Sequence, residues 1–218
     1  MTVVVLAGGS GGAKLAAGVQ DLTGAQRQIG RALGVRARVL PMCEQAVRTR
    51  VATPAGWRSI QEFLILDHGQ SAIEDVALDG LEEARPTPEV LAALAEADAI
   101  LVGPSNPVIS IGPILSVPGM REAIAASAAP VVAVSPFVAG RAVKGPTEAF
   151  MAAIGRPVSA AGVASLYEGL LDAMVVDAGD PDPGPEGVPL LACPTLMEGP
   201  AGRRALAEDV LGFAQTLA

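Results

Sequence analysis

The chain has few of the side chains that build metal clusters, disulfides or base-stacking surfaces. Among its 218 residues are one histidine, two cysteines and only 3% aromatic residues. Cys43 and Cys193 lie far apart in the sequence, so no zinc or iron–sulfur spacing can be built from them, and we expect reduced, buried thiols. The scarcity of aromatic side chains argues against a platform for stacking the bases of single-stranded nucleic acid.

Positive charge and long apolar runs are also scarce. The formal net charge is −8, from 15 Lys and Arg against 23 Asp and Glu, so we expect neither DNA nor RNA as a partner. Charged or turn-forming residues interrupt every apolar run before it reaches the length that spans a membrane. No basic region precedes an apolar segment near Met1, as a signal peptide requires. The sequence predicts a soluble, cytoplasmic protein with no membrane partner.

The chain does contain enough apolar residues for a large core. Hydrophobic residues make up 50% of it and charged residues 17%. Short apolar segments, typical of buried parallel strands, alternate with helical segments; they lie at residues 2–7, 99–102, 130–134, 173–176 and 190–192. This alternation predicts an α/β fold, a Rossmann-like three-layer sandwich with a mostly parallel sheet. We expect one nucleotide-binding domain over residues 1–218.

A different pattern occupies residues 36–80. Four successive segments read as strands, at residues 36–40, 47–53, 56–66 and 73–78, and they predict a small β-meander insert. Glu62 falls inside the third of these expected strands. Helices are expected at residues 13–22, 25–33, 86–95, 119–125, 147–154, 160–167 and 205–217.

The junction between the first strand and its helix is rich in glycine. It contains Gly8, Gly9, Ser10, Gly11, Gly12 and Lys14. The spacing fits neither the dinucleotide fingerprint, where Lys14 stands in place of the last glycine, nor the P-loop, where Ala13 precedes the lysine. Backbone amides without a Cβ can nevertheless approach a phosphate, and the following helix adds positive potential. The junction predicts a phosphorylated ligand, with a tight turn that binds nothing as the alternative.

Polar residues follow two further predicted strands. Ser105, Asn106 and Ser110 come after the strand at residues 99–102, within a segment that also holds Pro107 and Gly112. Residues 135–146, after the strand at residues 130–134, include Arg141 and Lys144. Because carboxyl ends of parallel strands share one edge, all three turns are predicted to form one site near a switch in strand order. A proline-stiffened surface loop and a solvated lysine are the alternatives.

Three aspartates and the single histidine are further candidates for functional residues. Asp177, Asp180 and Asp182 have a spacing found among metal ligands, but the surrounding proline and glycine predict a solvated loop. His68 precedes a glycine and is predicted to be a turn residue rather than a base. The sequence therefore assigns neither a metal ligand nor a catalytic residue.

Taken together, these segments resemble the 2-phospho-L-lactate transferase family of coenzyme F420 biosynthesis. The matching segments occur in the order typical of that family; they are residues 6–15, 47–51, 61–63, 103–107, 110–115, 134–136, 144–145 and 195–197, with Gly140. The run from residue 103 to 115, Pro-Ser-Asn-Pro followed by Ser-Ile-Gly-Pro, is the most specific of these matches.

The resemblance implies a reaction and its reactants. A phospholactyl or phosphoenolpyruvyl group would pass from a guanylyl-diphospho donor to the deazaflavin Fo, releasing GMP, with Mg²⁺ as cofactor and a homodimer as the assembly. The glycine loop and Lys14 would bind the diphosphate, and Lys144 would neutralise charge. The nucleotide and phosphates would also meet the segment with Ser105, Asn106, Pro107, Ser110 and Gly112.

The chain departs from the family at one place. Members continue from the first helix into a second strand, an acidic Asn-Thr-Gly-Asp-Asp-like motif and a largely helical insert, whereas this chain passes from Leu22 to Ala25 without them. We therefore expect a family segment to be absent here. A non-catalytic, sugar-nucleotide-binding regulatory protein of the same superfamily is the alternative that suits such a short form. The failed fingerprint disfavours an NAD-dependent oxidoreductase.

Overall fold

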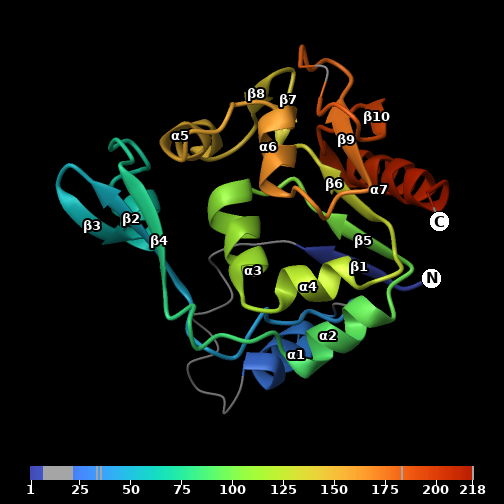
Figure 1. Ribbon diagram of the computed structural model, residues 1–218, viewed down its shortest axis with the longest axis horizontal. Coiled ribbons are helices and arrows are strands. Elements are labelled where there is room, and N and C mark those ends of the chain that lie inside the picture. Colours follow the sequence, from blue (N-terminus) through green and yellow to red (C-terminus); the bar gives the residue numbers. More distant parts are fainter. Residues whose placement is uncertain (7–21, 33, 35, 183, 218) are drawn as a thin grey trace.

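A five-stranded parallel sheet forms the centre of the protein (Figure 1). The structure is a computed structural model that describes residues 1–6, 22–32, 34, 36–182 and 184–217. The spatial order β1-β5-β6-β9-β10 comprises β1 (Val3–Leu6), β5 (Ala99–Val102), β6 (Val131–Val134), β9 (Ala173–Asp177) and β10 (Leu190–Cys193). All neighbouring pairs in this sheet are parallel. Their continuous apolar runs suit strands that are buried on both faces.

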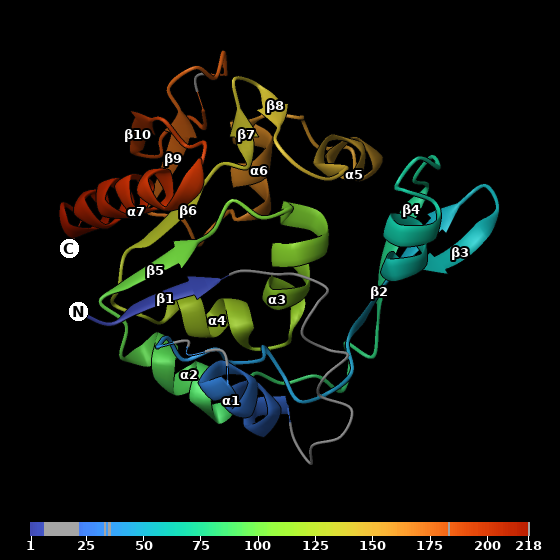
Figure 2. The ribbon, with the colours of Figure 1, turned by 180° about the vertical axis from the view of Figure 1, so that it is seen from behind.

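Helices cover both faces of the sheet (Figures 1 and 2). Helix α7 (Gly199–Gln215) buries Leu206 and Val210 against one face. The opposite face packs against α2 (Pro88–Ala95), α3 (Gly112–Ser116), α4 (Met120–Ala125) and α6 (Ala160–Leu166). Adjacent strand residues point to opposite faces, so Val132 belongs to the α7 side and Ala133 to the other. The predicted three-layer α/β architecture is confirmed.

The predicted meander is present as a separate antiparallel sheet beside the main body (Figure 1). Its order is β3-β2-β4, with β2 (Arg48–Thr53), β3 (Gly56–Ser59) and β4 (Asp75–Asp79). The expected strand at residues 36–40 is wrong, because no strand forms there. The side chains of Val51, Phe63 and Phe150 are fully buried together and join the meander to the main body.

The prediction that Glu62 lies within a strand is also wrong. Glu62 begins a π-helical turn, η2 (Glu62–Leu66), and its Oε2 accepts hydrogen bonds of 2.8 Å from both the backbone N–H and the hydroxyl of Ser59. The turn rotates Phe63 into the core, where its ring meets the ring of Phe150 edge-on at a centroid distance of 5.7 Å. Burial of that aromatic pair outweighs the strand propensity of the segment.

Several helices and strands differ from expectation outside the meander. A π-helical segment, η3 (Pro107–Ile111), and α3 occupy the segment for which a proline-stiffened surface loop was the alternative. The segment after β6 forms a small hairpin of β7 (Phe137–Val138) and β8 (Arg141–Ala142). The remaining helices are α1 (Leu22–Ala32) and α5 (Thr147–Ala153). Among the described residues, no helix is long and apolar enough to cross a membrane.

Candidate functional site

The ends of strands β1, β5 and β6 lie at one edge of the main sheet. The backbone N–H of Gly103, just after β5, donates to the carbonyl of Leu6 at the end of β1, at 3.0 Å. A Cβ on Gly103 would stand 3.3 Å from that same carbonyl oxygen, so the glycine permits this close approach. The N–H of Ser135, just after β6, donates to Val175 of β9 at 2.9 Å. The turns after β5 and β6 therefore begin at the edge where β1 ends, as predicted.

Of two further parts of the sequence prediction, one concerns residues outside the described part of the chain and the other is contradicted by the described strands. The six glycine-loop residues (Gly8, Gly9, Ser10, Gly11, Gly12 and Lys14) lie outside the described residues. The expected switch in strand order is not found among the described strands, because they run from β1 to β10 in sequence order across the main sheet. The shared edge, rather than a reversal of strand order, defines the candidate site.

Asn106 is held by the protein on both ends of its amide. Its Oδ1 accepts hydrogen bonds from the backbone N–H groups of Val108 and Ile109, at 2.9 and 3.1 Å, and so caps η3. Its Nδ2 donates to the hydroxyl of Thr147, the first residue of α5, at 3.3 Å. Pro107 follows the cap, where its missing N–H costs nothing. The sequence reasoning proposed Asn106 as a ligand contact and missed this structural use of its side chain.

Ser105 and Ser110 are half-buried and keep their hydroxyls available. The backbone N–H of Ser105 donates to Gly103 at 2.7 Å in a tight turn, and that of Ser110 donates to Asn106 at 3.0 Å. Within the described part of the chain, neither hydroxyl makes a hydrogen bond. These two side chains are therefore free to donate to an anionic ligand at the edge of the sheet.

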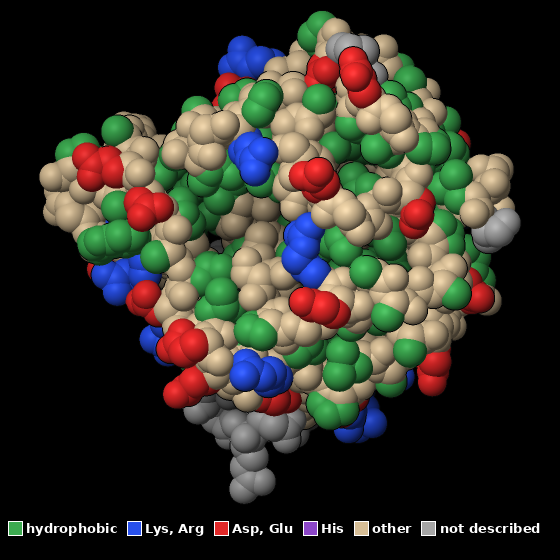
Figure 3. Space-filling view, viewed as in Figure 1, with side chains coloured by type: hydrophobic (Ala, Val, Ile, Leu, Met, Phe, Trp, Pro, Cys, Tyr) green, Lys and Arg blue, Asp and Glu red, His purple; other side chains and the backbone are tan. Residues whose placement is uncertain are grey.

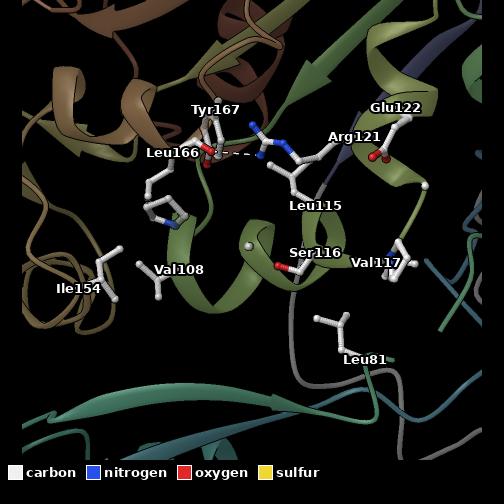
Figure 4. A pocket seen from close by; sticks show the side chains of 14 residues that line it. Leu81, Val108, Leu115, Ser116, Val117, Arg121, Glu122, Ile154, Leu166 and Tyr167 are labelled. Carbon is white, nitrogen blue, oxygen red and sulfur yellow. Dashed lines mark hydrogen bonds between the residues drawn. The ribbon is translucent and has the colours of Figure 1, made fainter. Parts of the chain in front are cut away.

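A cavity of about 590 Å³ lies beside the same helical segment (Figure 4). Its lining is mainly apolar and includes Leu81, Pro107, Val108, Gly112, Leu115, Val117, Ile154, Leu166 and Tyr167. Figure 3 shows this face of the molecule hollowed between the meander and the main body. Pro107 and Gly112 line the cavity, whereas Ser105, Asn106 and Ser110 do not. The structure thus divides the predicted residues of this segment into a cavity group and an edge group.

Arg121 closes one wall of this cavity. Its guanidinium donates to the carbonyl oxygen of Leu166 at 3.3 Å, where α6 ends (Figure 4). It also donates to the carbonyl oxygen of Glu168 at 2.8 Å. A cation at this position also suits the negative end of a helix. Tyr167 in the same wall is 2% exposed, and burial raises the pKa of its hydroxyl far above the ordinary value, so the side chain stays neutral.

Lys144 and Arg141, the two cations of the segment after β6, differ in their partners. Arg141 pairs with Glu148 at 3.1 Å, and the hydrogen bond from the N–H of Ala142, together with this arginine, lowers the pKa of Glu148. Lys144 is exposed and forms no ion pair with any residue that the structure describes. It follows the hairpin and precedes Thr147, which contacts Asn106. Lys144 is the cation of this segment that remains available to a ligand.

Asp177 occupies a buried position, which corrects the prediction of a solvated loop. Its side chain is exposed by 8% at the end of β9. Oδ1 accepts from the N–H groups of Gly179 and Ala139, at 3.0 and 3.3 Å, and Oδ2 accepts from the N–H and hydroxyl of Thr195, at 2.9 and 3.2 Å. Burial alone would raise the pKa of Asp177, but these hydrogen bonds outweigh it and lower the pKa. An acidic residue directly after an apolar strand was the signal for this role.

The described residues do not fit a magnesium site. No group of three or more His, Cys, Asp or Glu among them could hold a metal ion. Both oxygens of Asp177 are occupied by hydrogen bonds, and those of Asp182 accept from Ala161 and Gly184, each at 3.1 Å.

Comparisons with known proteins bear on this arrangement. Residues 21–185 match the sequence profile of 2-phospho-L-lactate transferase CofD. A 2-phospho-L-lactate transferase from Methanococcoides burtonii is 42% identical over 170 residues, which cover 76% of this chain and 55% of the relative. A phosphoenolpyruvate transferase from Kitasatospora aureofaciens is 39% identical over 201 residues, covering 86% of this chain and 63% of the relative.

The fold also has a solved counterpart. A structure of protein BH3568 from Bacillus halodurans, of the UPF0052 family, superposes with a TM-score of 0.61 at 20% identity, covering 91% of this chain and 70% of that one. The likeness at this identity shows the fold alone. This chain spans between 55% and 64% of the length of the transferases from M. burtonii and Methanosarcina barkeri. The matched profile covers most of the chain, including the turns after β5 and β6, and the chain therefore belongs to the 2-phospho-L-lactate transferase CofD family.

Proposed function

We propose that this chain transfers a phosphorylated three-carbon acid, phospholactyl or phosphoenolpyruvyl, from a guanylyl-diphospho donor to the deazaflavin Fo in coenzyme F420 biosynthesis. The names of its relatives, 2-phospho-L-lactate transferase and phosphoenolpyruvate transferase, support this reaction class. The observation that supports the proposal is the meeting of the end of β1 with the turn after β5, where the backbone N–H of Gly103 donates to the carbonyl of Leu6 at 3.0 Å. By resemblance to the family, we propose a cytoplasmic homodimer.

The proposed chemistry is a phosphoryl transfer that depends on positioning. A hydroxyl oxygen of Fo would form a bond to the phosphorus next to the three-carbon acid, while the bond from that phosphorus to the oxygen of GMP breaks. The attacking hydroxyl gives up its proton, and GMP leaves with the bonding electrons. Ser105 and Ser110 would donate hydrogen bonds to phosphate oxygens, and Lys144 would offset their charge.

A requirement for Mg²⁺ is a separate part of the proposal. Because the described carboxylates offer no fitting site, the phosphates of the donor would be the main ligands of the ion, as is common for Mg²⁺. Removal of divalent ions with EDTA is expected to stop turnover, and added Mg²⁺ is expected to restore it.

Release of GMP in the presence of both reactants tests the proposed reaction. We expect GMP to appear when the purified protein is given the guanylyl-diphospho donor and Fo, but not when Fo is omitted. Chromatography of the nucleotides provides the measurement. Tight calorimetric binding of a sugar nucleotide, with no GMP formed from any of the proposed donors, would instead establish the non-catalytic regulatory alternative.

Replacement of Lys144 by alanine is expected to raise the KM for the donor about tenfold. A change of this size corresponds to the loss of one exposed charge-assisted hydrogen bond. The loss should shrink at high salt, because added ions screen an exposed charge. Arg141→Ala is the matched control, since Arg141 is already engaged by Glu148. Equal effects of the two substitutions on KM would show that Lys144 has no special place at the site.

A further inference from the structure

We infer that Thr147 is a positioning residue that fixes Lys144 at the carboxyl edge of the sheet by holding the side-chain amide of Asn106. The inference rests on the proposed function, because it assigns Lys144 to the phosphates of the donor. Thr147 was not among the residues that the sequence singled out. It is 2% exposed and stands at the start of α5, three positions after Lys144.

The orientation of the Asn106 amide makes Thr147 its required partner. Oδ1 is committed to two backbone N–H groups of η3, at 2.9 and 3.1 Å. The amide nitrogen must then point away from η3, and there it donates to the Thr147 hydroxyl at 3.3 Å. A flipped amide would place its N–H₂ group against the two N–H donors of η3. The hydrogen bond thus joins the turn after β5 to the first residue of α5.

The two ends of the segment that carries Lys144 are both anchored. On one side, the hairpin of β7 and β8 is held by Asp177, which accepts from Ala139 at 3.3 Å, and by Glu148, which accepts from Ala142 at 3.2 Å. On the other side, α5 is fixed by the buried ring of Phe150. Residues 143–146 connect β8 to α5, between these anchors. Loss of the Thr147 contact would remove the hydrogen bond that ties this end of the span to Asn106, leaving Phe150 as its anchor in the core.

Two substitutions of Thr147 distinguish the contribution of its hydrogen bond from that of its side-chain shape. Thr147→Val keeps the branched side chain but removes the acceptor, whereas Thr147→Ser keeps the acceptor. We expect Thr147→Val to lower kcat/KM for the donor by roughly tenfold to a hundredfold. Displacement of a binding group such as Lys144 by about 1 Å has effects of up to this order. Thr147→Ser should stay within about threefold of the wild-type value, as its hydroxyl can still accept.

A double-mutant cycle with Lys144→Ala tests whether Thr147 acts through Lys144. If it does, adding Thr147→Val to Lys144→Ala will cost no more than about twofold in kcat/KM, since the group being positioned is already gone. The control is Thr53→Val in the meander, where a threonine that is 2% exposed donates to Gly56 at 2.9 Å. That substitution also removes one buried threonine hydroxyl, and its effect should add to that of Lys144→Ala.

Binding and hydrogen-exchange measurements, which need no turnover, distinguish failure of this inference from failure of the proposed function. In calorimetry with GDP as the probe, the dissociation constants of Thr147→Val, Lys144→Ala and the double variant should show the same non-additivity. Without ligand, amide hydrogen exchange over residues 143–147 should be faster in Thr147→Val than in the wild type. Wild-type protein that fails to bind GDP would overturn the proposed function, while faster exchange would still support the anchoring by Thr147. Bound GDP with additive effects in the cycle, or unchanged exchange over this segment, would overturn the inference and leave the proposed function standing.

Discussion

Gly162→Ala is expected to abolish stable folding or to lower the melting temperature severely. Gly162 lies in α6, and a Cβ there would stand 1.9 Å from the backbone oxygen of Pro157 and 2.8 Å from its carbonyl carbon. The obstacle is backbone, so no side-chain rotation relieves it. The N–H of Gly162 also donates to the hydroxyl oxygen of the N-cap residue Ser159 at 3.1 Å, which fixes this end of the helix. We expect a cost of about 3 kcal/mol or more, a large part of the stability of a typical domain.

Gly212→Ala is the matched control for this prediction. Gly212 lies inside α7, where a Cβ would meet nothing within 4 Å. Alanine has the higher helix propensity, so this variant should be more stable by about 0.5–1 kcal/mol. Thermal unfolding followed by circular dichroism measures both variants. If Gly162→Ala melts at the wild-type temperature, the close approach of α6 to Pro157 is wrong.

Asp177→Ala is expected to destabilise the protein by about 3 kcal/mol, because it leaves buried donors without an acceptor. Three backbone N–H groups and the Thr195 hydroxyl depend on this carboxylate. For a chain of this size, that loss corresponds to a fall in melting temperature of roughly 6–12 °C. Asp180→Ala is the neighbouring control, since Asp180 accepts one hydrogen bond, from Asp182, at 3.1 Å. Equal losses of stability in the two variants would contradict a special stabilising role for the hydrogen bonds to Asp177.

The pH dependence of this loss has a definite sign. The folded protein holds the pKa of Asp177 below its ordinary value of 3.8, so the ionised form is favoured by folding. The stabilisation is therefore complete above that ordinary value and is lost as pH falls through the lower pKa of the folded state. The difference in unfolding free energy between wild type and Asp177→Asn should shrink below about pH 4. A difference that grows with acidity would overturn this assignment.

The centre of the main sheet was predictable because strands β5, β6 and β9 are largely buried on both faces. Strand β5 has the bounds that the sequence predicted, since an unbroken apolar run between turn residues is typical of such a strand. The half-exposed segments were less predictable. The alternation that suggested a strand through Glu62 gave way to a π-helical turn, because Ser59 donates hydrogen bonds to the Glu62 carboxylate and Phe63 reaches a distant aromatic partner, Phe150.

The helix after Asn106 escaped prediction because proline usually marks a loop. Pro107 instead stands at the first helical position, where its fixed φ and missing N–H are tolerated, and Asn106 supplies the cap. The buried role of Asp177 also escaped prediction, because its partners Ala139 and Thr195 lie far from it in the sequence. Local patterns do not reveal which loops will meet at the end of a strand.

The sequence by itself determined the family, the α/β class and the strand ends that carry polar residues. Only the tertiary structure decided which of those polar groups are already satisfied. The side chains of Asn106 and Asp177 are hydrogen-bonded within the protein, whereas those of Ser105, Ser110 and Lys144 have no such partner among the described residues. The physical reason is that a buried polar group must find a partner, and that partner is chosen by distant segments that folding brings together.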